Sequence, residues 1–133
     1  MSITISYTQQ TGGSTSYSVT FEHFTEGSLP RSYIDEISFD FTTAGSAVKG
    51  GPARVPKRIW AISGVLSDAD TQELESMYRA WATDIGTGLS CVVSISDSTF
   101  GSTVTASSVV STAPTYSKFG PNDWVASIGL TEI

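Results

Sequence analysis

The feature that most constrains the fold of this chain is a strict alternation of apolar and polar residues in several short segments. Ile3, Ile5 and Tyr7 alternate with serine and threonine, and the same pattern recurs in residues 17–22 and 36–41. A period of two places the apolar side chains on one face of a β-strand. These segments therefore predict strands with one face against a core and the other toward solvent.

Strand patterns continue in the second half of the chain. Residues 59–65 predict a largely apolar strand, and residues 124–131 predict a last alternating strand. Residues 91–95 and 104–110 predict a hairpin around a turn at 97–101. The chain is therefore expected to be dominated by strands.

One segment breaks this pattern and predicts a helix. The run Ser67-Asp68-Ala69-Asp70 offers an N-cap with acids in the first turn. Gly86 and Gly88 follow as stop signals, so the helix is expected to end near Asp84. Its apolar residues recur at helical spacing on one stripe: Leu74, Met77, Tyr78, Trp81 and Ile85. The stripe predicts a face that packs on a sheet.

Length and composition fit a single domain covering residues 1–133. Only 15% of the residues are charged, while serine, threonine and glycine are abundant, a mixture typical of strands and turns. The predicted fold class is mainly β with one helix (α+β). The expected architecture is an antiparallel β-sandwich or barrel flanked by a single amphipathic helix.

Residues 43–58 predict a long flexible loop, because they are rich in glycine and poor in large apolar side chains. The segment carries Lys49, Arg54, Lys57 and Arg58, which are four of the seven basic residues of the chain. Two interpretations are open. The segment is either a solvated hairpin loop or an arm that docks on the acidic body of a neighbouring copy.

The formal net charge of −6 disfavours partners with a negative surface, such as nucleic acid or anionic lipid. The single cysteine, Cys91, has no partner for an internal disulfide, and the chain begins without the pattern of a signal peptide. No apolar run approaches the roughly 20 residues that cross a bilayer as a helix. We therefore expect a soluble protein that is made in the cytoplasm and binds no membrane.

The sequence offers few groups for catalysis or metal binding. His23 is the only histidine and is expected to be structural, and Cys91 is expected to be a small buried apolar residue. Asp68 and Asp70 lack the glycine and distal glutamate of a calcium loop, so they are interpreted as helix-capping acids. We expect no enzyme activity, no catalytic residue, no cofactor and no metal site.

Three tryptophans leave another class of function open, because sugars stack on exposed aromatic faces. Trp60 and Trp124 lie in apolar strands and Trp81 lies on the helix stripe, so core packing is favoured for them. A small carbohydrate-binding β-sandwich is the alternative if two of them are exposed together.

Two segments resemble proteins of the tailed-bacteriophage tail. The run KRIWAISGVLSDADTQELESMYRAW, from Lys57 to Trp81, combines a strand, a capped helix and a closing Tyr-Arg-Ala-Trp. The final run STAPTYSKFGPNDWVASIGLTEI is similar to the long connection and last strand of tail-tube, tube-initiator and distal tail proteins. The resemblance covers about half of the chain.

The resemblance implies a structural protein of the virion tail. Six copies would join into a ring, and rings would stack around a channel that DNA passes through without specific binding. The segment 43–58 would contact the neighbouring ring through Lys49, Arg54, Lys57 and Arg58. Neighbouring tail or baseplate proteins would be further partners, and an acidic channel would agree with the net charge. Another virion component, such as a capsid cement or head–tail connector protein, is the alternative.

Sheet edges give an independent argument for assembly. The first and last predicted strands carry little charge, and unprotected edge strands tend to pair with other chains. Closure into a ring of subunits would remove such edges and is the favoured solution. An edge covered within the monomer is the alternative.

Overall fold

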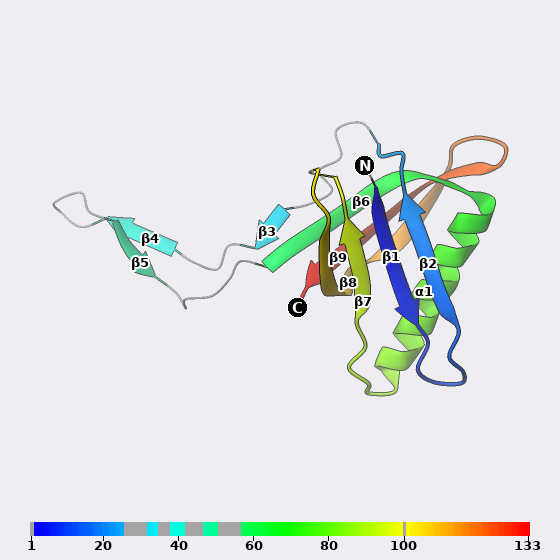
Figure 1. The fold of residues 1–133 in the computed structure, drawn as a ribbon, viewed down its shortest axis with the longest axis horizontal. Helices are drawn as coiled ribbons and strands as arrows, with labels where there is room; N and C mark the ends of the chain where they lie inside the picture. Colours follow the sequence, from blue (N-terminus) through cyan, green and yellow to red (C-terminus); the bar gives the residue numbers. More distant parts are fainter. Residues whose placement is uncertain (1, 26–31, 35–37, 42–46, 51–56, 100) are drawn as a thin grey trace.

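The computed structural model describes residues 2–25, 32–34, 38–41, 47–50, 57–99 and 101–133 (Figure 1). These residues form nine strands and one helix. The elements are β1 (Ile3–Thr8), β2 (Ser16–Phe21), β3 (Ser32–Ile34), β4 (Ser38–Phe41), β5 (Ala47–Gly50), β6 (Lys57–Ser67), α1 (Asp68–Gly86), β7 (Val93–Asp97), β8 (Val104–Lys118) and β9 (Asp123–Glu132). The predicted fold class, mainly β with one helix, is confirmed for this part of the chain.

Seven strands form one antiparallel sheet in the order β2-β1-β7-β8-β9-β6-β3. The predicted hairpin is β7–β8, and the predicted last strand is β9, which pairs with β6 from Ile59↔Thr131 to Ser67↔Asp123. Strand β8 runs beyond the predicted 104–110 because two irregularities in its pairing let it bend and continue along β9.

The sheet closes on itself into a barrel. The chain that leaves β2 meets β6 through a bridge between Phe24 and Gly64. Two backbone hydrogen bonds flank this bridge: Val65 N donates to His23 O at 2.8 Å, and Thr25 N donates to Ser63 O at 2.9 Å. Strand β3 pairs with the same edge of β6, at residues Lys57–Ile59 near the start of β6. The curved path of β6 across the molecule is visible in Figure 1.

The apolar residues of the alternating patterns fill the barrel. In β1, Ile3, Ile5 and Tyr7 are buried, while the serine and threonine between them are partly exposed. The register places Ile5 between Val19 of β2 and Ile95 of β7, both of which are buried. Burial of side chains of this size contributes about 1.5–3 kcal/mol each. The strands predicted from residues 3–7 and 17–22 are therefore confirmed.

Helix α1 follows β6 without a connecting loop and contacts β2 more than any other element. The predicted N-cap is confirmed, because the Ser67 hydroxyl accepts a hydrogen bond from Asp70 N at 3.3 Å. The Glu73 carboxylate accepts a hydrogen bond from the backbone N of Ser18 at 3.2 Å. The helix thus covers the edge of β2 that β1 leaves open.

These contacts bear on the two solutions expected for the sheet edges. Strand β2 is covered by α1, and β6 is paired by β3 and by the chain that follows β2. The first and last strands, whose edges the expectation concerned, are β1 and β9, and both lie inside the sheet; pairing of another subunit with the remaining edges stays a prediction. Closure of the sheet and the helix protect β2 and β6 within the monomer.

The buried face of α1 differs from the predicted stripe. Leu74 and Met77 are buried as expected, but Tyr78 and Trp81 are only partly buried and Ile85 is 37% exposed. Asp84 is fully buried instead. The last turns of α1 lie against the turn between β1 and β2, whose backbone amides need an acceptor, so a carboxylate is the side chain that faces inward there.

The segment predicted as a loop at 43–58 contains regular structure in its described residues. Ala47–Gly50 form β5, which pairs with β4, and Lys57 and Arg58 already belong to β6. The rest of the segment lies outside the described residues. The predicted loop boundaries are therefore wrong, because hydrogen bonding to neighbouring strands fixes the backbone at both places. Figure 1 shows the β4–β5 hairpin apart from the barrel.

Candidate functional site

The four residues predicted as an inter-ring contact fall on different parts of the chain. Lys49 lies in β5, opposite Phe39 of β4 in the register. Lys57 and Arg58 are the first two residues of β6, so their side chains project from opposite faces of that strand. Arg54 lies outside the described residues. The role of these residues at a contact between rings stays a prediction.

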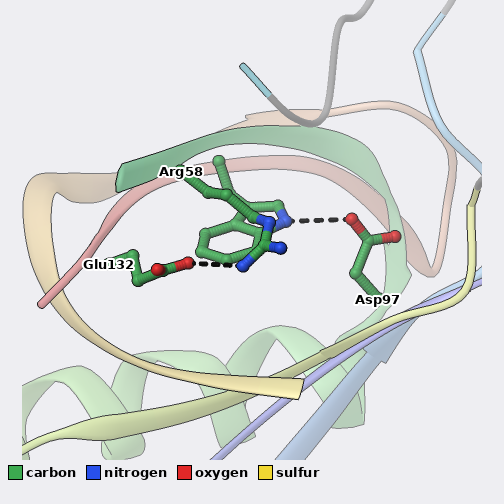
Figure 2. Close-up of polar contacts among 4 residues, drawn as sticks. Arg58, Asp97 and Glu132 are labelled. Atoms are coloured by element: carbon green, nitrogen blue, oxygen red, sulfur yellow. Dashed lines mark hydrogen bonds and ion pairs between the residues drawn. The ribbon is translucent and has the colours of Figure 1, made fainter. Parts of the chain in front are cut away.

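Arg58 belongs to a polar cluster at one end of the barrel (Figure 2). Its Nη1 atom donates to Glu132 Oε2 at 2.8 Å, and the two side chains are 30% and 18% exposed. In the same cluster, Trp60 Nε1 donates to Oδ2 of Asp97 at 2.9 Å, and both residues are fully buried. Positions 58 and 60 of β6 share its inward face, so the cluster fills the barrel end.

Asp97 was not predicted as a buried residue. Its Oδ1 atom accepts a hydrogen bond from the backbone N of Thr99 at 2.9 Å, which is the arrangement of an Asx turn. The predicted turn at 97–101 is present, since Gly101 N donates to Ser98 O at 3.3 Å. The sequence Asp97-Ser98-Thr99 is typical of such a turn and could have indicated it. Both carboxylate oxygens are engaged in internal hydrogen bonds, so the residue is structural.

A second buried carboxylate, that of Asp84, holds the β1–β2 turn against the end of α1. It accepts hydrogen bonds from the backbone N of Gln10 at 2.8 Å and of Thr11 at 3.1 Å, and from the hydroxyls of Thr11 and Tyr7. The hydrogen bonds from the Thr11 and Tyr7 hydroxyls hold the pKa of Asp84 below its usual value, although burial opposes them. Burial and the neighbouring Asp84 raise the pKa of Tyr7. The pair is therefore an ionised acid and a neutral phenol that brace the fold.

The remaining reactive residues have structural surroundings. Cys91 is buried, as predicted. His23 differs from the expectation of a structural histidine, because the residue is exposed and only its backbone carbonyl takes part in the barrel closure. Asp68 is more than a capping acid: its Oδ1 atom accepts a hydrogen bond from Trp124 Nε1 at 2.6 Å. Within the described ranges, no group of three or more histidine, cysteine or acidic residues could hold a metal ion.

The tryptophans do not form the exposed pair that a sugar platform requires. Trp60 is fully buried, whereas Trp81 and Trp124 are partly buried. Trp124 is bonded to the first residue of α1, and Trp81 lies 13 positions further along that helix. At 1.5 Å per residue the two positions are about 20 Å apart along the helix axis. The geometry therefore gives no support to the carbohydrate-binding alternative.

The outward face of the barrel is rich in hydroxyl groups. A shallow depression over three adjacent strands is lined by Thr4, Ser6, Ser94, Ser96, Thr105 and Ser107. Some of these hydroxyls pair across strands, as Thr4 does with Thr20 at 3.0 Å. None of the residues lining this depression is charged.

Comparisons of the chain with protein-family models, with curated proteins and with solved structures find no match. Among the residues that the structure describes, no helix is long and apolar enough to cross a membrane. The two buried carboxylates are occupied by internal hydrogen bonds.

Proposed function

We propose that the chain is a structural subunit of a bacteriophage virion tail, without enzyme activity. Six copies assemble into a ring, and rings stack around a channel that conducts DNA. The residue patterns that resemble tail proteins, from Lys57 to Trp81 and at the C-terminal end, motivate the proposal. The observation that carries it is the contrast between the closed barrel and the hairpin β4–β5 that stands apart from it.

The hairpin is the part of the described structure that most needs another chain. Strands β4 and β5 form a two-stranded sheet of their own. An isolated two-stranded hairpin is marginal in water, and its outer edges are templates for pairing with another protein. In the barrel, by contrast, β6 is paired by β3 and by the chain that follows β2. This division supports a role in which the barrel forms the body of a subunit and the hairpin reaches a neighbour.

The hydroxyl-rich outer face supports a surface that tolerates passing DNA. Affinity for nucleic acid comes mainly from lysine and arginine side chains that neutralise phosphates. The depression over β1, β7 and β8 offers hydroxyl groups and no cation. Such a face would let a polyanion move past without ion pairing. Its neutrality differs from the acidic channel that the resemblance implies, so DNA would be tolerated here by lack of attraction and not by repulsion.

The mass of the native particle tests the proposal. Light scattering after size exclusion should give a particle of six protomers at physiological salt, and electron microscopy should show rings. A trimer would favour a capsid cement protein instead. A monomer at all concentrations up to the millimolar range would refute the proposed assembly.

Substitution of basic residues separates ring formation from ring stacking. Arg54→Glu combined with Lys57→Glu should shorten or abolish stacks while leaving single rings intact, because charge pairs of about 0.2–1 kcal/mol each are repeated around a ring. Arg79→Glu, on the exposed side of α1, is the matched control and should leave stacks unchanged. Stacks that persist in the double variant and in high salt would contradict a docking role for the segment 43–58.

A further inference from the structure

A groove on the outside of the barrel has no role in the fold described above. It has a volume of about 380 Å³ and lies between the first half of α1 and strands β8 and β9. The helix contributes Thr71, Gln72 and Glu75 to its wall, and the strands contribute Tyr116 and Trp124. The groove therefore combines two aromatic side chains with one carboxylate.

The phenol of Tyr116 faces the Glu75 carboxylate in this groove. Its hydroxyl oxygen is buried, and no group of the described residues donates a hydrogen bond to it. Burial and the nearby Glu75 carboxylate raise the pKa of Tyr116 above its usual value. A buried oxygen that accepts no hydrogen bond is unfavourable. An incoming group that donates a hydrogen bond to this oxygen would remove that penalty.

The second aromatic wall is already fixed and already in contact with a cation. Trp124 Nε1 is bonded to Asp68 Oδ1, which holds the indole in place. The Lys118 ammonium lies 4.5 Å from the centroid of the Trp124 ring. A cation over an indole face is attracted by the negative charge of the π system. Lys118 therefore already occupies one face of this indole, so an incoming cation would be attracted by Glu75 and not by Trp124.

These features select one class of ligand. A guanidinium or ammonium group could pair with the Glu75 carboxylate and donate a hydrogen bond to the Tyr116 oxygen. An anion would meet the Glu75 carboxylate. A purely apolar group would leave the Tyr116 hydroxyl without a partner.

We infer that this groove receives a basic side chain from residues 49–57 of a second copy of the chain. This inference rests on the proposed function, because it names the surface on which the neighbouring subunit docks. Three of the seven basic residues of an acidic chain lie within this short segment: Lys49, Arg54 and Lys57. We do not include Arg58 among the side chains that could enter the groove, because its guanidinium is bonded to Glu132 of its own chain. Opposite charge and a fitting cavity therefore favour this occupant.

Strand length argues that the occupant comes from another copy. The groove lies beside the start of α1, which follows Ser67, whereas the basic segment ends at Lys57, the other end of β6. Ten residue steps of strand span about 33 Å. Arg54 is three residue steps before Lys57, which is fixed in β6, so it lies at most about 11 Å from Lys57 even when the chain is fully stretched. A contact between two copies satisfies the distance, and the position of the hairpin in Figure 1, away from α1, agrees with it.

A peptide titration tests the groove directly. A synthetic peptide with the sequence of residues 47–58 contains no tryptophan, so its binding to the intact protein can be followed by tryptophan fluorescence. We expect saturable binding that Glu75→Gln weakens about ten-fold, since a charge-assisted hydrogen bond is lost. Tyr116→Phe should weaken binding about three-fold or more without lowering the thermal midpoint. The matched control Glu22→Gln removes an exposed acid outside the groove and should bind like the wild type.

Two results would overturn the inference in this assay. One is the absence of saturable binding. The other is an equal loss of affinity in Glu75→Gln and Glu22→Gln, which would indicate unspecific attraction to an acidic surface. A thermal melt of each variant separates loss of binding from loss of the fold.

Charge exchange in the full chain tests the contact between copies. Glu75→Arg and Arg54→Glu should each reduce stacking, and the two changes together should restore it, because the pair is re-formed with reversed charge. If the protein forms stacked rings that Glu75→Arg leaves unchanged, the inference fails and the proposed function stands. If the protein stays monomeric, the proposed function fails, and the peptide titration alone decides whether the groove binds the basic segment.

Discussion

Replacement of Gly64 by alanine should open the barrel where the chain after β2 meets β6. A methyl group on Gly64 would lie 2.6 Å from the backbone oxygen of His23 and 3.1 Å from Cδ1 of Phe21. The closer neighbour is backbone, so no flexible side chain can move aside. The same oxygen accepts the hydrogen bond from Val65 N at 2.8 Å, which ties the two segments together. The added carbon must therefore push the segments apart.

The size of the effect follows from what is lost. Separation removes the backbone hydrogen bonds that Val65 N and Thr25 N donate across the bridge. Each contributes about 0.5–1.5 kcal/mol net, and forcing an extra methyl group into a packed site costs a further 1–3 kcal/mol or so. We expect a loss of about 2–6 kcal/mol in the free energy of unfolding. Since small domains have only about 5–15 kcal/mol in total, the variant should be marginal.

Urea unfolding followed by tryptophan fluorescence measures this loss. Gly86→Ala is the matched control, because a methyl group there meets nothing within 4 Å and the residue ends α1. Alanine is the better helix former, so this control should be neutral or stabilising by up to about 1 kcal/mol. Hydrogen exchange should show early opening at the Val65 amide in Gly64→Ala. A loss below about 0.5 kcal/mol, with wild-type protection of that amide, would refute the closed barrel.

Three further predictions concern the polar clusters and the helix. Because the folded pKa of Asp84 lies below its ordinary value of 3.8, its stabilising contribution is present above that value and is lost as the pH falls through the folded pKa. Asp84→Asn should therefore lower stability at pH 7 and flatten the acid limb of a stability–pH curve, and an unchanged acid limb would contradict this reasoning. Trp81→Ala should lower the free energy of unfolding by about 1.5–3 kcal/mol in chemical denaturation, through lost packing and the lost hydrogen bond from Nε1 to Cys91 O at 3.2 Å. The loss should be smaller than for a fully buried tryptophan, because the side chain is partly exposed. Arg58→Met should lower the free energy of unfolding by about 1 kcal/mol, and this loss should shrink in 1 M salt, because its partner Glu132 is only partly buried. A larger loss that does not depend on salt would indicate that Arg58 supports the barrel end by packing.

Local patterns along the chain were sufficient to predict the elements of the body. Alternation identified β1, β2 and β9, and the N-cap at Ser67 marked the start of α1. These signals are local: a period of two or a capping hydroxyl acts between residues a few positions apart. The same reasoning placed a loop where Ala47–Gly50 form β5, because a strand of small and polar residues has no apolar period to reveal it.

The candidate site depends on neighbours that are distant in the sequence. The burial of Asp84 follows from amides of Gln10 and Thr11, more than 70 positions away, and the groove brings Glu75 beside Tyr116 and Trp124.

The sequence by itself determined the class of the fold, the position of the helix and the concentration of positive charge in residues 49–58. Only the tertiary structure decided that the sheet closes, that Arg58 is paired inside its own chain, and that an acid replaces Ile85 on the buried face of α1. The physical reason is that backbone periodicity is set by adjacent residues. The partner of a buried charge or of a sheet edge is set by whichever segments the closed fold brings into contact.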